Sequence, residues 1–320
     1  MKYIDFFKLQ QYPFSLMPDP RLFLDCAPHK QAFAYLTYGL SKGEGFVVIT
    51  GEVGAGKTIL IDYFMAKLAK TSAVTAKISS TQFEADDFLR MVASSFGLPQ
   101  ERADKATVFR RLESFLIETH RARGRAILIV DEAQGLPFSA LEEMRMLSNI
   151  YYQNRPLLQV FLVGQPEFRG MLASTTLEQL RQRVVAIVHL NPLSESEVKE
   201  YILHRLNAVG WNNDPSFAPE CFSLIHELTR GVPRQINSLC DRLFWNAFIE
   251  GSHAISPEDV EDVFEDMKAD ATGIDEALGI EPAIELPTRN THEGEARAVG
   301  AGTHGSDRIV DFRNPNENEG

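Results

Sequence analysis

The chain lacks any long hydrophobic run and contains very little cysteine. No window approaches the roughly 18 consecutive apolar residues that a membrane-spanning helix needs. The three cysteines, Cys26, Cys221 and Cys240, are far apart and form no Cys-x-x-Cys pair, which argues against a disulfide framework and a zinc site. The N-terminus carries charges and a proline where a signal peptide requires an apolar core. These absences favour a cytoplasmic protein with no integral membrane segment, which could associate with the inner membrane through partners.

Positive charge is also in deficit. The 320 residues include 44 acidic and 32 basic side chains, a net charge of −12. This balance argues against a strongly basic nucleic-acid surface, although it leaves room for a local basic patch. Much of the negative charge lies in residues 269–320, which contain 11 acidic and 4 basic residues and few apolar ones. We expect that segment to be a disordered tail.

The most informative motif that is present is GFVVITGEVGAGKT at residues 45–58, where an apolar run leads into Gly-x-x-x-x-Gly-Lys-Thr. Such a loop lets successive backbone N–H groups point at a phosphate, beside the positive N-terminal end of a helix. Lys57 is expected to reach the β- and γ-phosphates of ATP, and the Thr58 hydroxyl to bind Mg²⁺. The residues predicted to contact the nucleotide are Gly51, Glu52, Val53, Gly54, Ala55, Gly56, Lys57, Thr58 and Ile59.

A second motif supplies two carboxylates. Five apolar residues, AILIV, precede Asp131 and Glu132, as in a strand that is buried on both faces of a parallel sheet. At the carboxyl end of that strand, Asp131 would hold the Mg²⁺ shell. Glu132 is placed to orient or polarise the attacking water, which would make the protein a hydrolase. Without the upstream loop, a solvated carboxylate would be the simpler interpretation of Glu132.

Apolar runs alternate with helical patterns through the first 190 residues. Strands that alternate with helices predict an α/β fold of the P-loop type, with a parallel five-stranded sheet covered by helices on both faces. The strands are expected at residues 46–50, 74–78, 127–130, 160–163 and 185–190. Helices are expected at residues 59–69, 85–96, 105–122 and 139–149.

The pattern changes after residue 190. Asn191-Pro192 interrupts the chain, and Ser194 with Glu197 fits a capping box at the start of a new helix. Helical stretches without strands follow at residues 194–209, 219–230, 233–250 and 257–267. We therefore predict three parts: a nucleotide-binding α/β domain at 1–190, a small all-helical lid domain at 191–268 and the acidic tail at 269–320.

Two polar residues stand where they could sense the γ-phosphate. Gln165 follows the apolar run 158–164, so its amide is expected at a strand end, near the γ-phosphate or the attacking water. Arg234, in Gly-Val-Pro-Arg at residues 231–234, is expected to reach the phosphates from the lid. The alternatives are a loop glutamine and a capping or surface arginine.

Two arginines and a proline-rich segment complete the candidates. Arg181 and Arg183 precede the last predicted strand, where a guanidinium could neutralise charge on the nucleotide of a neighbouring subunit. We place Arg183 ahead of Arg181, but the sequence leaves the choice open. Residues 13–20 are too rich in proline for a helix, and this segment either wraps the adenine edge or packs Phe14 into a core.

Together these motifs resemble an AAA+ ATPase. The opening resembles the ExeA/GspA-type secretion ATPases through FFKLQQYPFSLMPDPRLFL, His29, AYLTYGL and GFVVITGEVGAGKT. A closer likeness is to the secretion ATPase encoded at exosortase (PEP-CTERM) and exopolysaccharide loci. It is carried by STQFEADDFLRMVASSFGLP, LEEMRMLSNI, FLVGQPEFR, LEQLRQRV and GVPRQINSLCDRL. The likeness covers residues 2–267.

The resemblance implies a βαβ core with a helical lid, Mg-ATP as ligand and assembly with its own kind into a homo-oligomeric ring or filament. It also implies an ATPase that powers or regulates envelope secretion or exopolysaccharide export and assembly, with proteins of those machineries as partners. Two departures are visible. ExeA continues into a membrane span and a peptidoglycan-binding domain, neither of which is found in this sequence, and Ile59 replaces a second threonine after the loop.

Two other functions remain open at this point. Transposition-regulator and replication-initiator ATPases share these motifs, so a DNA-associated regulator is one alternative. Such proteins usually add basic tracts or a DNA-binding domain after the lid, whereas an acidic segment follows here. The other alternative is a nucleotide-gated scaffold with little turnover, whose function would not depend on Glu132.

Overall fold

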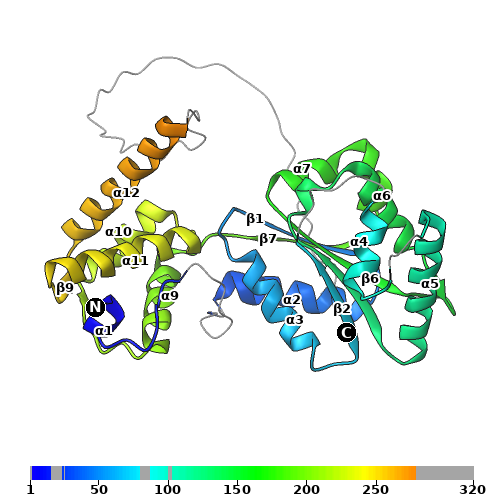
Figure 1. Cartoon of the computed structure of the whole chain (residues 1–320), viewed down its shortest axis with the longest axis horizontal. Coiled ribbons are helices and arrows are strands. Elements are labelled where there is room, and N and C mark those ends of the chain that lie inside the picture. Colours follow the sequence, from blue (N-terminus) through cyan, green and yellow to red (C-terminus); the bar gives the residue numbers. More distant parts are fainter. Residues whose placement is uncertain (1, 16–23, 25, 80–86, 100–102, 279–320) are drawn as a thin grey trace, which may run out of the picture. The chain divides into compact units, whose positions relative to one another are not determined.

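The structure, a computed structural model, describes residues 2–15, 24, 26–79, 87–99 and 103–278. Its central feature is a parallel five-stranded sheet in the order β2-β3-β6-β1-β7 (Figure 1). The strands are β1 (Phe46–Gly51), β2 (Ala73–Ile78), β3 (Arg125–Val130), β6 (Leu158–Gly164) and β7 (Val184–Leu190). Each contains one of the five predicted strands, so the predicted α/β fold is confirmed.

The sheet lies between two layers of helices. Phe46 and Val48 of β1 pack into the apolar cluster on one face, whereas Val47 and Ile49 pack into the cluster on the other. Successive strand residues point to opposite faces, so an uninterrupted apolar run serves both layers. One layer contains α2 (Ala27–Lys42) and α3 (Lys57–Leu68). The other contains α4 (Phe88–Ser95), α5 (Lys105–Arg121), α6 (Phe138–Leu147), α7 (Glu167–Ala173) and α8 (Glu178–Arg181).

The remaining elements of this part are short. They are the 3₁₀ turns η3 (Ala133–Gly135) and η4 (Thr175–Leu177) and the hairpin strands β4 (Tyr151–Tyr152) and β5 (Arg155–Pro156). Helices α2, α7 and α8 and this hairpin are absent from the sequence prediction. The predicted helix at 85–96 is confirmed from Phe88 onwards, and its first two residues lie outside the described ranges.

The lid is formed by α9 (Glu195–Ala208), α10 (Glu220–Thr229), α11 (Pro233–Glu250) and α12 (Pro257–Leu278). The predicted capping box is present at the start of α9, where the Ser194 backbone N–H donates to the Glu197 carboxylate at 2.9 Å. The two-residue strands β8 (Ser216–Phe217) and β9 (Ala254–Ile255) pair in parallel, so the prediction of a lid without strands was wrong.

Helix α12 is longer than predicted, since it ends at Leu278 and not near residue 267. The sequence prediction assigned residues from 269 onwards to a tail on their composition, but residues 269–278 contain good helix formers, and the single glycine among them, Gly273, costs a helix only about 1 kcal/mol. The rest of the predicted tail, residues 279–320, lies outside the described residues.

The N-terminal segment packs on the lid. Helix α1 (Tyr3–Phe6) and the residues after it contribute Tyr3, Phe7, Leu9 and Phe14 to the apolar cluster of the lid. The Tyr3 hydroxyl donates to Asp241 at 2.5 Å, and the ring centroid of Phe14 lies 5.7 Å from that of Phe244. The sequence prediction placed this segment with residues 1–190, yet its described residues complete the lid core. Phe14 is therefore a core residue, whereas residues 16–20 of the same proline-rich segment lie outside the described residues.

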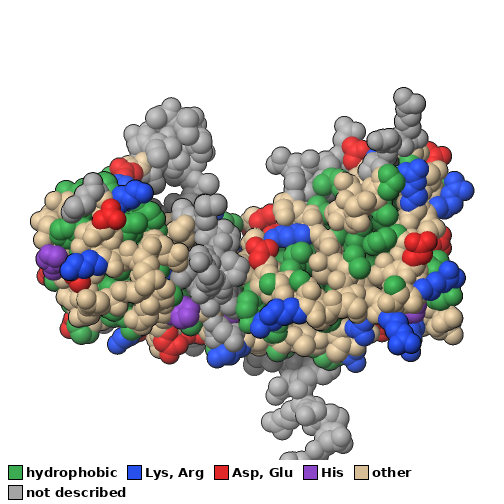
Figure 2. All heavy atoms as spheres, turned by 60° about the horizontal axis from the view of Figure 1, so that its bottom comes forward, with side chains coloured by type: hydrophobic (Ala, Val, Ile, Leu, Met, Phe, Trp, Pro, Cys, Tyr) green, Lys and Arg blue, Asp and Glu red, His purple; other side chains and the backbone are tan. Residues whose placement is uncertain are grey.

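The surface carries charges of both signs. Figure 2 shows acidic and basic side chains interspersed over one face, with several Lys and Arg side chains at its right-hand end. Among the described residues, no helix combines the length and the apolar composition that crossing a membrane would require.

A tight backbone contact within the lid joins the segment before α9 to the start of α11. Gly231, just before α11, has φ +71°, and a Cβ placed on it would lie 1.9 Å from the Leu193 carbonyl oxygen. The Leu193 N–H donates to the Gly231 carbonyl at 2.9 Å. Only glycine satisfies both the positive φ and the close approach at this position.

We predict that Gly231→Ala lowers the free energy of unfolding by about 3 kcal/mol, because it adds a backbone clash to the strain of a positive φ. Gly97→Ala is a matched control, since Gly97 has φ +77° but no atom within 4 Å of its Cβ position; it should lose only about 1 kcal/mol. Urea unfolding of both variants measures the difference. Equal losses would show that the Leu193 contact is unimportant.

Candidate functional site

The glycine-rich loop lies between the end of β1 and the start of α3. Gly54 and Gly56 have φ +84° and +94°, which allows the chain to turn from strand to helix with its N–H groups directed inward. Gly56 is also the N-cap of α3, so the loop ends at a helix N-terminus. His29, which the sequence analysis did not assign to the site, packs behind the loop: its Nε2 lies 3.0 Å from a Cβ placed on Gly56.

Lys57 is held against the loop that it follows. Its side chain is buried, and Nζ donates to the carbonyl oxygens of Gly51 at 2.7 Å and Glu52 at 2.9 Å. Burial lowers the pKa of Lys57, while the nearby Glu132 and Asp131 carboxylates oppose that shift. A phosphate group at the loop would offer the ammonium a stronger, charged acceptor than these carbonyls.

The Thr58 hydroxyl and the Asp131 carboxylate lie next to each other. The Thr58 hydroxyl donates to Asp131 Oδ2 at 3.1 Å. Asp131 is 4% exposed, and burial raises its pKa, whereas the hydrogen bond from Thr58 lowers it. A hydroxyl and a carboxylate at this distance fit Mg²⁺, which prefers oxygen ligands and usually takes only one or two from the protein beside phosphate and water.

Glu132 is held by two amides. Its backbone is in the left-handed region, with φ 55° and ψ 41°. Its carboxylate Oε2 accepts from Gln134 Nε2 at 2.6 Å and from Gln165 Nε2 at 3.3 Å. The structure therefore brings Gln165 to Glu132, as expected of a residue at the end of the neighbouring strand.

Gln134 was missed by the sequence analysis. Besides binding Glu132, it accepts the Gln165 backbone N–H on Oε1 at 3.0 Å. Its only sequence signal is its position two residues after Glu132 in Asp-Glu-Ala-Gln. Gln134 thus connects the ends of β3 and β6 and fixes where the Glu132 carboxylate lies.

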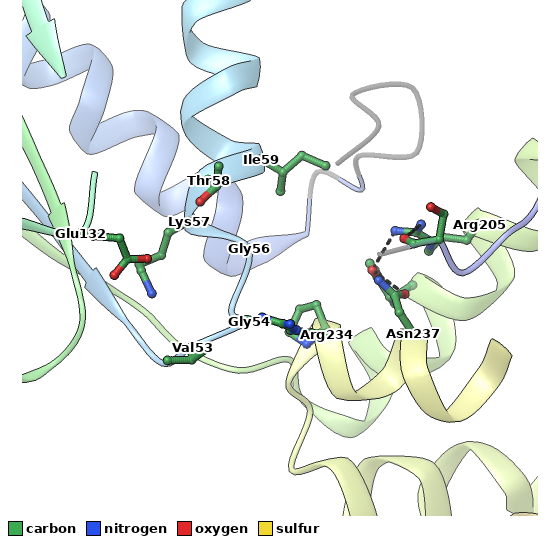
Figure 3. Close-up of a pocket in the computed structure, with 13 residues that line it drawn as sticks. Val53, Gly54, Gly56, Lys57, Thr58, Ile59, Glu132, Arg205, Arg234 and Asn237 are labelled. Carbon is green, nitrogen blue, oxygen red and sulfur yellow. Dashed lines mark hydrogen bonds between the residues drawn. The ribbon is translucent and has the colours of Figure 1, made fainter. Parts of the chain in front are cut away.

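The lid contacts the loop directly. The Arg234 backbone N–H donates to the Gly54 carbonyl at 3.2 Å, and a Cβ on Gly54 would lie 2.5 Å from Arg234 Cβ. Between loop and lid is a cavity of about 350 Å³ (Figure 3). It is lined by Ser15, Val53, Gly54, Gly56, Lys57, Thr58, Ile59, Glu132, Tyr201, Arg205, Pro233, Arg234 and Asn237.

A buried polar network in the lid side of this cavity was also missed. Arg205, which is 4% exposed, donates from Nε to the Pro13 carbonyl at 2.6 Å and from one Nη to the Tyr201 hydroxyl at 2.9 Å. Tyr201 in turn donates to Asn237 Oδ1 at 3.0 Å. The network ties α9, α11 and the N-terminal segment together. The sequence gave no signal for this role, because Arg205 looks like any other arginine on an amphipathic helix.

The structure does not bring Arg181 and Arg183 to the cavity. The Arg183 carbonyl accepts the N–H of Phe46, the first residue of β1, at 2.9 Å, whereas the loop follows the last residue of β1. A six-residue strand spans roughly 20 Å, so both arginines lie at the opposite edge of the sheet. One Nη of Arg181 donates to the Ala173 carbonyl at 3.0 Å. Neither can act on the nucleotide of its own chain.

Comparisons with known proteins agree with this geometry. The family model for an AAA domain matches residues 40–172. Among solved structures, the chain superposes on Cdc6p of Pyrobaculum aerophilum with a TM-score of 0.61 at 18% identity, covering 78% of this chain and 69% of that one. The described core therefore has the AAA fold of P-loop nucleoside triphosphatases.

Within that class, the chain is similar to general secretion pathway protein A of Aeromonas hydrophila. The two are 39% identical over 259 residues, which is 81% of this chain and 47% of the relative. A shorter match, 30% identical over 125 residues, is to the Mu-like prophage FluMu DNA transposition protein B of Haemophilus influenzae, covering 39% of this chain and 41% of that protein. The chain thus spans less than half the length of each of these two relatives.

The buried carboxylate of Asp131 predicts a stability effect with a defined sign. Burial raises its pKa, so folding favours the protonated form, and the charged form lowers stability once the pH exceeds that pKa. Asp131→Asn should therefore raise the free energy of unfolding of the ligand-free chain at pH 7, with the gain shrinking as the pH falls through the Asp131 pKa.

Asp104→Asn is the control of opposite sign. Hydrogen bonds from Thr107 lower the pKa of Asp104, so its charged form stabilises the fold above the unfolded-state pKa. Its replacement should lower the free energy of unfolding at pH 7. Chemical denaturation at pH 7 and at pH 5 compares the two variants, and a loss of stability in Asp131→Asn would show that burial does not raise the pKa of Asp131.

Proposed function

We propose that the chain is a Mg²⁺-dependent ATPase that converts ATP binding and hydrolysis into movement of its lid. The observation that carries this proposal is the cavity lined by Lys57, Thr58 and Glu132 of the sheet domain and by Arg234 of the lid. A passive nucleotide-binding protein needs the loop and the metal ligands. It does not need a carboxylate fixed by two amides beside them.

Each residue has a distinct task in this proposal. The loop N–H groups and Lys57 bind the β- and γ-phosphates, and the oxygens of Thr58 and Asp131 hold Mg²⁺, which would neutralise charge on those phosphates. Glu132 orients the attacking water and accepts its proton, while Gln165 and Gln134 fix the carboxylate in place. Arg234 contacts the γ-phosphate and thereby connects the state of the nucleotide to the position of α11.

We further propose that this activity serves envelope secretion or the export and assembly of exopolysaccharide. The support is the 39% identity to a general secretion pathway protein over 81% of the chain, together with the motifs that resemble the ATPase of exosortase loci. Partners would be proteins of those machineries and other copies of the chain in a ring or filament. In that assembly Arg183, or its neighbour Arg181, would reach the nucleotide of the next subunit.

Replacement of the proposed catalytic carboxylate tests the hydrolytic function. We predict that Glu132→Gln binds ATP but hydrolyses it about 10² to 10⁴ times more slowly, because a general base is lost, whereas Lys57→Ala fails to bind ATP. Steady-state phosphate release and equilibrium nucleotide binding measure the two effects. Glu118→Gln, at an exposed position on α5, is the control and should keep the parent rate. A parent-like rate in Glu132→Gln would favour the scaffold alternative.

Mixing two inactive variants tests action between subunits. Arg183→Ala should lower the rate of ATP hydrolysis by about 10³. Adding Glu132→Gln chains should restore hydrolysis, because those chains supply Arg183 to sites in which Glu132 is intact. For the unaltered chain, the rate per subunit should rise with protein concentration. Arg181→Ala is the matched comparison: complementation by that variant alone would move the role to Arg181. Complementation by neither would exclude an arginine acting in trans.

A DNA-associated regulator is the second candidate function. It is favoured by the match to a prophage DNA transposition protein, although that match covers only 39% of the chain. Measuring ATP hydrolysis with and without double-stranded DNA separates the candidates. A hydrolysis rate that is unchanged by DNA supports the secretion proposal, whereas a rate that DNA increases supports the DNA-associated regulator.

A further inference from the structure

A second cavity lies at the edge of the sheet opposite the phosphate loop. It has a volume of about 270 Å³, and its lining includes Lys42, His120, Arg125, Arg155 and Gln159. These residues come from the ends of α2 and α5 and the starts of β3, β5 and β6. Because β3 runs from Arg125 towards Asp131, roughly 20 Å of strand separates this cavity from the proposed catalytic site. The two sites are therefore distinct.

The lining is cationic in a chain whose net charge is −12. Lys42, Arg125 and Arg155 are basic side chains, and no Asp or Glu is among the described residues that line the cavity. The ion pairs of the described residues involve none of the three. Arg125 is fixed by donation from one Nη to the Leu40 carbonyl at 2.7 Å. Cations held together without carboxylates raise the local potential and favour an anion.

Gln159 adds a polar group with an unmet hydrogen bond. It is 3% exposed, and its Nε2 donates to the Gly39 carbonyl at 2.5 Å. That bond fixes the orientation of the amide, since a carbonyl can only accept. The other amide atom, Oε1, has no hydrogen-bond partner among the described residues. Buried acceptors are normally satisfied, and Oε1 is itself buried, so a ligand that supplies a donor would complete this side chain after a small movement of the amide towards the cavity.

We propose that this cavity binds a small phosphorylated ligand that carries a hydroxyl group, such as a sugar phosphate. The phosphate would lie among Lys42, Arg125 and Arg155, and a hydroxyl would donate to Gln159 Oε1. The volume is slightly below the usual range of ligand pockets, which begins at about 300 Å³, and it suits a monosaccharide phosphate better than a larger molecule. The inference goes beyond the proposed ATPase function and does not depend on it.

Calorimetric binding of ribose 5-phosphate to the full chain tests the proposal. The experiment uses a Lys57→Ala background, so that the phosphate loop does not take up the probe. Lys42→Ala together with Arg155→Ala should weaken binding at least tenfold. The matched control is Lys30→Ala with Lys199→Ala, which removes the same charge at exposed positions elsewhere and should leave binding unchanged.

A second variant tests the hydroxyl contact. Sulfate carries no hydroxyl, so Gln159→Met should weaken ribose 5-phosphate binding while leaving sulfate binding unchanged; its melting temperature confirms that it is folded. The proposal is overturned if ribose 5-phosphate does not bind at millimolar concentration, or if both double variants bind equally. It is also overturned if the Lys42 and Arg155 changes alter only the oligomeric mass, because the cations would then serve contacts between chains.

Discussion

The candidate site depends on one constraint, the common direction of the five strands. Thr50 of β1 pairs with Gly164 of β6, and Val130 of β3 pairs with Leu162 of the same strand. The residues that follow these strand ends, namely the phosphate loop, Asp131 with Glu132, and Gln165, therefore meet at one edge. An antiparallel neighbour would have sent one of them to the far edge, where Arg183 lies. Residues more than a hundred positions apart thus form one site without any long loop to carry them.

The ligand-free site contains groups that folding alone would not favour. Lys57 and Asp131 are buried, and burial shifts the pKa of each in the direction that favours its neutral form. Glu132 has a positive φ, which costs a non-glycine residue free energy. The surrounding sheet tolerates these losses because its two apolar clusters are continuous. A bound Mg-nucleotide would satisfy the same groups, so binding should stabilise the chain by more than its contact area suggests.

The sequence predicts the sheet well, and it marks the residues that follow β1 and β3, because both features have local sequence signals. Five apolar runs marked the strands, and the spacing from Gly51 to Thr58 marked the loop. No local sequence signal marked Gln134, Arg205 or Asn237, because their roles depend on which strand ends and helices become neighbours in three dimensions. The N-terminal segment was misplaced for the same reason: proline spacing says nothing about which core will take up Phe14. Similarly, the helical spacing of apolar residues in α12 continues beyond residue 269, where the composition led to the prediction of a tail.

The packing of residues 3–14 on the lid imposes an order on folding. The bond between the Tyr3 hydroxyl and Asp241 joins residues 238 positions apart, so Tyr3 cannot make this contact until Asp241 has been synthesised. Until α11 is made, the aromatic rings of Tyr3, Phe7 and Phe14 have no core to enter. Long-range contacts of this kind form late and slowly. During synthesis the chain should therefore expose these aromatic side chains, and a molecular chaperone that shields them would raise the yield of folded protein.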